Sequence, residues 1–102
     1  MGPTLIMAKE KQGYTLSDIG TFLTFKEETG LVAIVDKGSI MLNVYSVIPV
    51  NSEKNPAVNA EMARNVVSFL TSPEIQELIG NYGVKDYGIS LFTPCADAEP
   101  KA

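Results

Sequence analysis

Residues 40–50 read IMLNVYSVIPV and form the longest strand-like stretch of the chain. β-Branched and aromatic side chains are frequent in it, which favours extended backbone. Pro49 has no amide hydrogen to donate, so it indicates an edge position or the end of a strand. The continuous apolar run at 31–35 predicts a second, buried strand, and residues 14–16 predict a short third one. These stretches decide the expected fold class.

Helical patterns surround the predicted strands in the first half of the chain. Residues 3–11 predict a short helix that turns Leu5, Ile6 and Met7 toward the core. Residues 18–29 predict a second helix, because apolar side chains recur at the three- and four-residue spacing of one helix face. Gly30 follows at the position where a left-handed C-terminal cap is expected.

The second half of the chain is predicted to be mostly helical. Asn59 is a candidate N-cap for a helix that runs to residue 71 with an apolar stripe. Ser72-Pro73-Glu74 has the sequence of a helix start, with a capping hydroxyl, a proline at the first helical position and a carboxylate near the positive end. This helix is expected to stop at Gly80, and residues 84–94 to be extended.

The order of these elements predicts an α/β fold, a mixed sheet with flanking helices. The 102 residues fit one small domain or a piece of a larger one, with 45% hydrophobic and 20% charged residues. Residues 1–94 are expected to form this single unit. Residues 95–102 are expected to be a loose tail.

Composition excludes several classes of function. The net charge is −4 and the eight Lys and Arg residues are scattered, which argues against nucleic-acid binding. One cysteine, Cys95, and no histidine rule out an internal disulfide, imidazole catalysis and Cys/His zinc sites. No apolar run reaches membrane-spanning length and no signal peptide opens the sequence. The acidic residues lie on solvated helix faces, so neither an enzyme, a metal site nor a cofactor is expected.

The stretch GYTLSDIGTFL at 13–23 contains the candidate site, with Thr15 and Ser17 beside the start of a helix and Tyr14 just before them. A helix N-terminus has unpaired N–H groups and about half a positive charge, so it can hold an anion without arginine. The alternative is that Ser17 or Thr15 only caps the helix, and spacing alone favours that simpler interpretation.

Three segments together resemble the tungstate-binding proteins of bacterial and archaeal ABC transporters, within the type 2 periplasmic binding protein class. The segment FLTSPEIQELIGNYG is typical of the whole class, whereas GYTLSD and LNVYSVIPVN are similar to the tungstate branch. The resemblance extends from Met1 to about Pro94. It implies transport of tungstate, or of a molybdate-like tetrahedral oxyanion, with the permease of the transporter as a partner and a periplasmic or extracellular location, membrane-anchored or not.

The resemblance also implies two α/β lobes around a cleft, of which this chain is the C-terminal part. Residues 1–40 are then expected in the second lobe, and residues 41–94 in the crossing strand and the helices of the first lobe. Thr15, Tyr14 and Ser17 are expected at the cleft rim as ligand-binding residues, while Asp18 caps the helix. The main anion-binding residues are expected outside this chain.

Two other functions remain open at this point. The same architecture serves as a ligand-sensing domain in regulators or receptors, and a truncated module can lack ligand binding altogether. An incomplete lobe also leaves apolar helix faces such as Met62, Val66 and Leu70 without a partner, so self-association of the chain is a further expectation.

Overall fold

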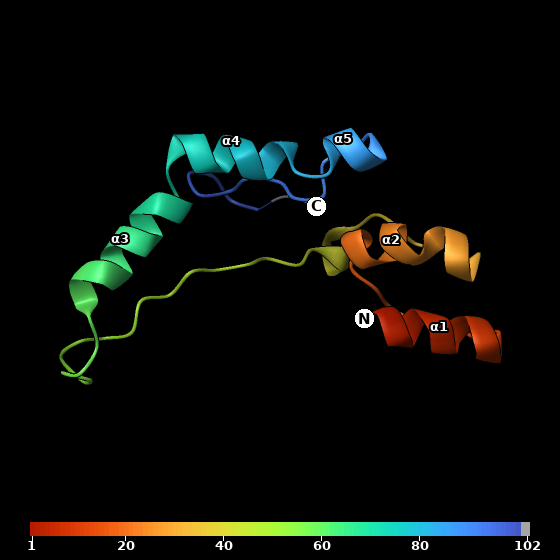
Figure 1. The fold of residues 1–102 in the computed structure, drawn as a ribbon, viewed down its shortest axis with the longest axis horizontal. Helices are drawn as coiled ribbons and strands as arrows, with labels where there is room; N and C mark the ends of the chain where they lie inside the picture. The colour runs from red at the N-terminus through yellow and green to blue at the C-terminus, as the bar shows by residue number, and fades with distance from the viewer. Residues whose placement is uncertain (101–102) are drawn as a thin grey trace.

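The structure is a computed structural model that describes residues 1–100. It consists of helices joined by long extended segments (Figure 1). The helices are α1 (Gly2–Lys11), α2 (Ile19–Thr29), the short 3-10 helix η1 (Ser39–Met41), α3 (Ala60–Leu70), α4 (Pro73–Asn81) and α5 (Val84–Tyr87).

The predicted α/β fold is wrong for this chain, because no strand is present among residues 1–100 and helix accounts for 48% of the structure. The segments 14–16, 31–35 and 40–50 are strand-like in composition but carry no strand. A strand exists only when its backbone pairs with a neighbour, and these segments meet no such neighbour within the described part of the chain. Residues 32–35 are exposed rather than buried.

The helix predictions are confirmed, together with their caps. The Asp18 carboxylate accepts a hydrogen bond of 2.8 Å from the Thr21 backbone N–H, and Gly30 ends α2 in the left-handed conformation at φ 67°. Asn59 accepts from the backbone N–H of Met62 at 3.0 Å, and Ser72 caps α4. Sequence patterns within a few residues of one another therefore predicted the positions of these helices correctly.

Two details of the helix prediction are wrong. Gly80 lies inside α4, which continues to Asn81, and α5 occupies the start of a stretch expected to be extended. Between the two helices Gly83 has φ 91°, and a Cβ there would lie 2.5 Å from the Leu91 side chain. This turn needs glycine for both its backbone angle and its close approach.

The most extensive contact between helices in residues 1–100 is between α1 and α2. Leu5 and Ala8 are its buried apolar residues, while Met7, expected in the core, is 55% exposed. A Cβ on Gly2 would lie 2.6 Å from the Phe25 ring, so glycine permits this close approach. Lys9 adds a hydrogen bond from its Nζ to the Glu28 carbonyl oxygen at 2.8 Å.

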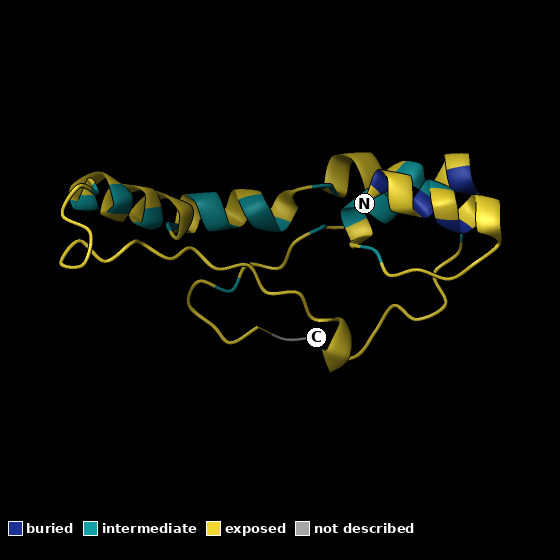
Figure 2. Ribbon diagram, turned by 90° about the horizontal axis from the view of Figure 1, so that it is seen from below, coloured by how far each residue is buried: buried dark blue, intermediate teal, exposed yellow. Residues whose placement is uncertain are grey.

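The rest of the molecule is open. The radius of gyration is 17.6 Å, whereas a compact chain of this length has about 13 Å. Figure 2 shows buried residues only in the α1–α2 pair, with the extended segments exposed along nearly their whole length. The expected tail begins at Cys95 without helix or strand as far as residue 100, and its last two residues lie outside the described part.

Candidate functional site

The candidate site residues lie on the connection between α1 and α2. Tyr14 is 90% exposed, Thr15 is exposed and Ser17 is partly buried. The Ser17 hydroxyl donates to the Asp18 carbonyl oxygen at 2.9 Å, and the Thr15 hydroxyl makes a long contact of 3.4 Å with the Leu16 carbonyl oxygen. Both hydroxyls lie near the start of α2, but each contacts a backbone carbonyl in its own segment.

The N-cap of α2 is Asp18, and neither the Thr15 nor the Ser17 hydroxyl caps this helix. One carboxylate oxygen accepts from the Thr21 backbone N–H and the other from the Thr21 hydroxyl, both at 2.8 Å. Chiefly because of the first bond, and then the second, the pKa of the Asp18 carboxyl lies below its ordinary value. The helix end therefore already carries an anionic group at neutral pH, which opposes a second anion at the same place. The prediction that Asp18 is the cap is confirmed.

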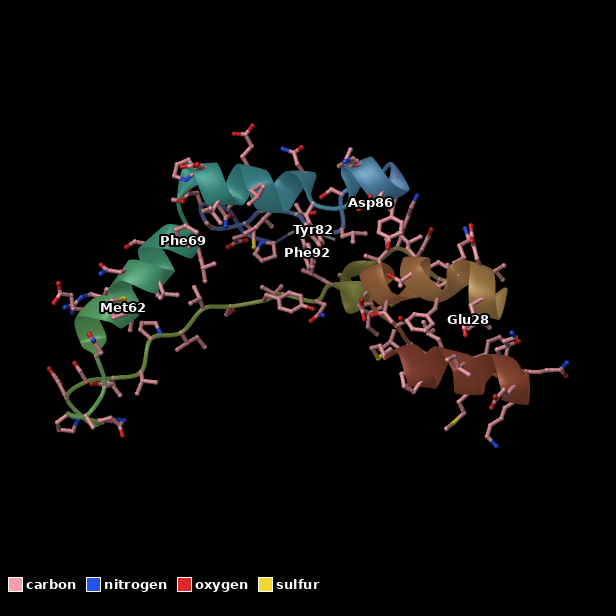
Figure 3. All side chains as sticks on the ribbon, in the orientation of Figure 1. Glu28, Met62, Phe69, Tyr82, Asp86 and Phe92 are labelled. Atoms are coloured by element: carbon pink, nitrogen blue, oxygen red, sulfur yellow. The ribbon has the colours of Figure 1, made fainter. Side chains whose placement is uncertain are left out.

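A hollow of about 410 Å³ lies between α2 and the α4–α5 turn. Thr24 and Tyr87 join its two sides through their hydroxyls, 3.1 Å apart. Figure 3 shows Tyr82, Asp86 and Phe92 on the side of this hollow formed by the C-terminal segments. None of the three predicted site residues lines it. Its only carboxylate, Asp86, makes it a poor place for an oxyanion.

A second, apolar hollow of about 220 Å³ adjoins the first and is lined by Leu78, Ile79, Tyr82 and Phe92. The Phe92 ring contacts two tyrosines, with centroids 5.9 Å from Tyr82 and 6.1 Å from Tyr45. Sequence analysis did not single out Phe92. Phe92 is distant in sequence from both tyrosines. No local sequence pattern therefore indicates this aromatic cluster.

Within residues 1–100, no group of three or more Cys, Asp or Glu side chains could hold a metal ion. The same part of the chain contains no helix of the length and apolar character that crossing a membrane requires.

Comparison with known proteins first indicates a class, the anion-binding proteins of ABC transporters. The chain is 46% identical over 104 aligned residues to a Haloferax volcanii protein provisionally named ABC transporter anion-binding protein, a match that covers 97% of this chain and 30% of that protein. No family model and no solved structure matches the chain.

The name of a second relative is more specific, because it states which anion that protein binds. The chain is 48% identical over 96 residues to the tungstate-binding protein TupA of Peptoclostridium acidaminophilum, a match that covers 94% of this chain and 34% of that protein. The chain thus matches a fragment of a tungstate-binding protein, which confirms the resemblance seen in its sequence. It spans about a third of the length of these curated relatives. Both relatives are named as binding proteins rather than enzymes.

Proposed function

We propose that this chain is part of a non-enzymatic solute-binding protein that captures tungstate, or a similar tetrahedral oxyanion, for an ABC importer. The observation that carries the proposal is the identity of 46–48% to two anion-binding relatives over nearly the whole chain. The transporter's permease is the proposed partner, and the periplasmic or extracellular side of the membrane is the proposed location.

In this proposal the chain contributes one wall of the oxyanion site. Thr15 and Ser17 carry hydroxyls that can turn from their backbone acceptors toward a ligand, and the exposed Tyr14 lies beside them. Neutral hydroxyl donors suit a tetrahedral oxyanion, because the negative charge of the acceptor makes each hydrogen bond charge-assisted. Such bonds are stronger than hydrogen bonds between two neutral groups. Because the ionised Asp18 nearby opposes an anion at this helix end, binding requires further donors from other segments. We propose that these donors lie outside the stretch of the protein that the chain represents.

The division of the chain near residue 40 between two lobes is also a proposal. Residues 1–40 would lie on one side of the ligand, and residues 41–94 would pass to the other side. The long exposed connection from η1 to α3 is compatible with such a crossing.

The test is calorimetry on a chimera in which this chain replaces the matching third of the P. acidaminophilum relative. We expect heat of binding with tungstate or molybdate, measured against sulfate and phosphate. The absence of heat with all four oxyanions, from a folded chimera, would contradict the proposed function.

Single substitutions in the chimera then test the site. Thr15→Ala and Ser17→Ala should each weaken tungstate binding by roughly tenfold or more, because a hydrogen bond to a charged group contributes about 1.5–3 kcal/mol. Thr4→Ala is the matched control, since it removes an exposed hydroxyl from α1. Unchanged affinity in both site variants would exclude these two hydroxyls from the site.

A further inference from the structure

One hydrogen bond links the N-terminal and C-terminal parts of the chain across the larger hollow. The hydroxyls of Thr24 on α2 and Tyr87 on α5 lie 3.1 Å apart. Apart from the local bonds of η1, no other hydrogen bond within residues 1–100 joins residues 1–40 to residues 41–100. This contact, the Thr24–Tyr87 bridge, is therefore the polar link between α2 and the C-terminal segments.

The direction of the bridge follows from the second partner of Thr24. A hydroxyl has a single hydrogen to donate, and its lone pairs accept. The Thr24 hydroxyl donates its hydrogen to the Gly20 carbonyl oxygen at 2.9 Å. The Tyr87 hydroxyl is therefore the donor to Thr24, and the two bonds run from Tyr87 through Thr24 to the backbone of α2.

The sequence YGVKDYG at 82–88 determines where Tyr87 lies. Gly83 and Gly88 flank α5 in the left-handed conformation, at φ 91° and 72°, which other residues rarely adopt. The Tyr87 backbone N–H donates to the Gly83 carbonyl oxygen at 2.8 Å, which closes a single helical turn. Because a tyrosine side chain has few rotatable torsions, this turn holds the hydroxyl in place at a low cost in entropy.

A second contact lies on the same face of α2. Gly20 and Thr24 are one helical turn apart, so they share this face. A Cβ on Gly20 would lie 3.6 Å from a methyl carbon of Leu91. The Leu91 N–H donates to the Tyr82 carbonyl oxygen at 2.9 Å, which holds Leu91 against the α4–α5 turn. This face of α2 thus meets the C-terminal segments at both Leu91 and Tyr87.

The start of α2 connects this face to the candidate site. Thr21 lines the hollow and also gives both of its hydrogen bonds to Asp18, the N-cap. Ser17 directly precedes that cap. A shift of α2 away from the C-terminal segments would therefore carry the candidate hydroxyls with it. When only a fraction of the molecules has the binding geometry, the apparent affinity falls in proportion to that fraction.

We propose that Tyr87 is a positioning residue for the oxyanion site. Its hydroxyl holds α2 through Thr24, so that Thr15 and Ser17 are in place before the ligand arrives. Tyr87 itself does not contact the ligand. This role rests on the proposed function, whereas the hydrogen bond that carries it is present without an oxyanion.

Calorimetry of the chimera with tungstate tests this role. Tyr87→Phe and Thr24→Val should each weaken binding by about two- to tenfold, the range that one intramolecular hydrogen bond contributes. Thr24→Ser keeps the hydroxyl and should bind as the parent does. The double variant Tyr87→Phe/Thr24→Val should be no weaker than either single variant, because both changes remove the same bond. Additive losses, or full affinity in both single variants, would overturn the proposal.

Thr71→Val is the matched control for Thr24→Val. The Thr71 hydroxyl also donates to a carbonyl oxygen one turn earlier, that of Val67 at 2.8 Å. In the described part of the chain, no tyrosine hydroxyl bonds to Thr71. Its replacement should leave the tungstate affinity unchanged. A loss as large as that of Thr24→Val would assign the effect to the helix rather than to the bridge, and would overturn the proposal.

Stopped-flow kinetics on the chimera separates positioning from direct contact. A smaller fraction of ready molecules lowers the association rate of tungstate and leaves its dissociation rate unchanged. Loss of a direct contact mainly raises the dissociation rate. Tyr87→Phe should therefore slow association. Faster dissociation with unchanged association would show that Tyr87 touches the ligand, and would overturn the positioning role.

The bridge is also testable in the 102-residue chain without any oxyanion. Spin labels on Glu27→Cys in α2 and Lys85→Cys in α5, with Cys95→Ser, report the distance between the two helices. The distance distribution should be narrow, and Tyr87→Phe should broaden it. An equally narrow distribution in Tyr87→Phe would show that the bridge does not hold α2, which would overturn the proposal.

The outcomes separate this proposal from the proposed function. A chimera that binds tungstate equally well with and without the Tyr87 hydroxyl supports the function and contradicts the positioning role. A chimera that binds no oxyanion contradicts the function, and a distance distribution that broadens in Tyr87→Phe would still support the bridge.

Discussion

Asp18 is the residue whose chemistry the structure defines best. Its two carboxylate oxygens accept from the backbone N–H and the hydroxyl of Thr21, which satisfies an unpaired donor at the start of α2. These bonds favour the ionised carboxylate and lower its pKa. A charge at this place stabilises the helix and, for the same reason, makes the helix end less receptive to an external anion.

Replacement of Asp18 by Ala should destabilise α2 by about 1 kcal/mol, because the first turn loses its cap. Far-UV circular dichroism should show reduced helix content at neutral pH. Asp36→Ala, which removes an exposed carboxylate from a segment outside the helices, is the control. A helix content of Asp18→Ala equal to that of the control would show that the cap contributes nothing.

The same cap should make helix content depend on pH. Because the pKa of Asp18 is lowered in the folded chain, its stabilisation is present above the usual carboxyl value of 3.8 and is lost as the pH falls through the lowered value. Asp18→Asn keeps a capping oxygen but cannot titrate, so its helix content should change less in this acidic range. An identical acid titration of the two proteins would contradict this account.

At the scale of elements, the α1–α2 pair contrasts with the other helices. It contains Leu5, 2% exposed, and is held further by the hydrogen bond from Lys9 to Glu28. In α3 and α4 no residue is buried, although both helices have proper caps. Caps determine where a helix begins. Because short isolated helices are only marginally stable in water, packing determines whether a capped helix is stable.

Truncation of two apolar residues on α1 should therefore have unequal effects. Leu5→Ala removes most of the small buried contact and should destabilise the α1–α2 pair by about 2 kcal/mol or more. Met7→Ala removes an exposed side chain and should change stability by less than about 0.5 kcal/mol. Urea titration followed by circular dichroism measures both. Equal effects would show that the α1–α2 contact does not stabilise the pair.

At the scale of the whole molecule, the described residues form a set of helices without a common core, and three of the helices, α2, α3 and α4, have a side-chain N-cap. The dimensions of 51 × 28 × 24 Å reflect the exposed connections that precede η1 and α3. Burial of apolar surface is the main favourable contribution to folding, and among the described residues the fully buried apolar side chains, Leu5 and Ala8, both lie in one helix pair. The extended shape of the described part of the chain follows from this small amount of buried apolar surface.

The isolated chain should bind no oxyanion measurably. Thr15 and Ser17 are not enclosed, and the ionised Asp18 opposes an anion at the nearby helix end. Calorimetry of the 102-residue chain with tungstate, molybdate, sulfate and phosphate should show only heats of dilution. Binding of tungstate at micromolar affinity by the chain alone would show that its own residues suffice.

The sequence by itself determined the helices, their caps and the relationship to tungstate-binding proteins. These depend on side chains within a few residues of each other, such as Asp18 with Thr21 or Asn59 with Met62, and on residue identities along the chain. The predicted residues Tyr14, Thr15 and Ser17 stay a prediction. Only the tertiary structure decided what became of residues 31–35 and 40–50, because a strand requires a partner that lies elsewhere. In this chain no such partner is found among residues 1–100. Residues 40–41 lie in η1, and residues 32–35 and 42–50 are exposed without forming a strand.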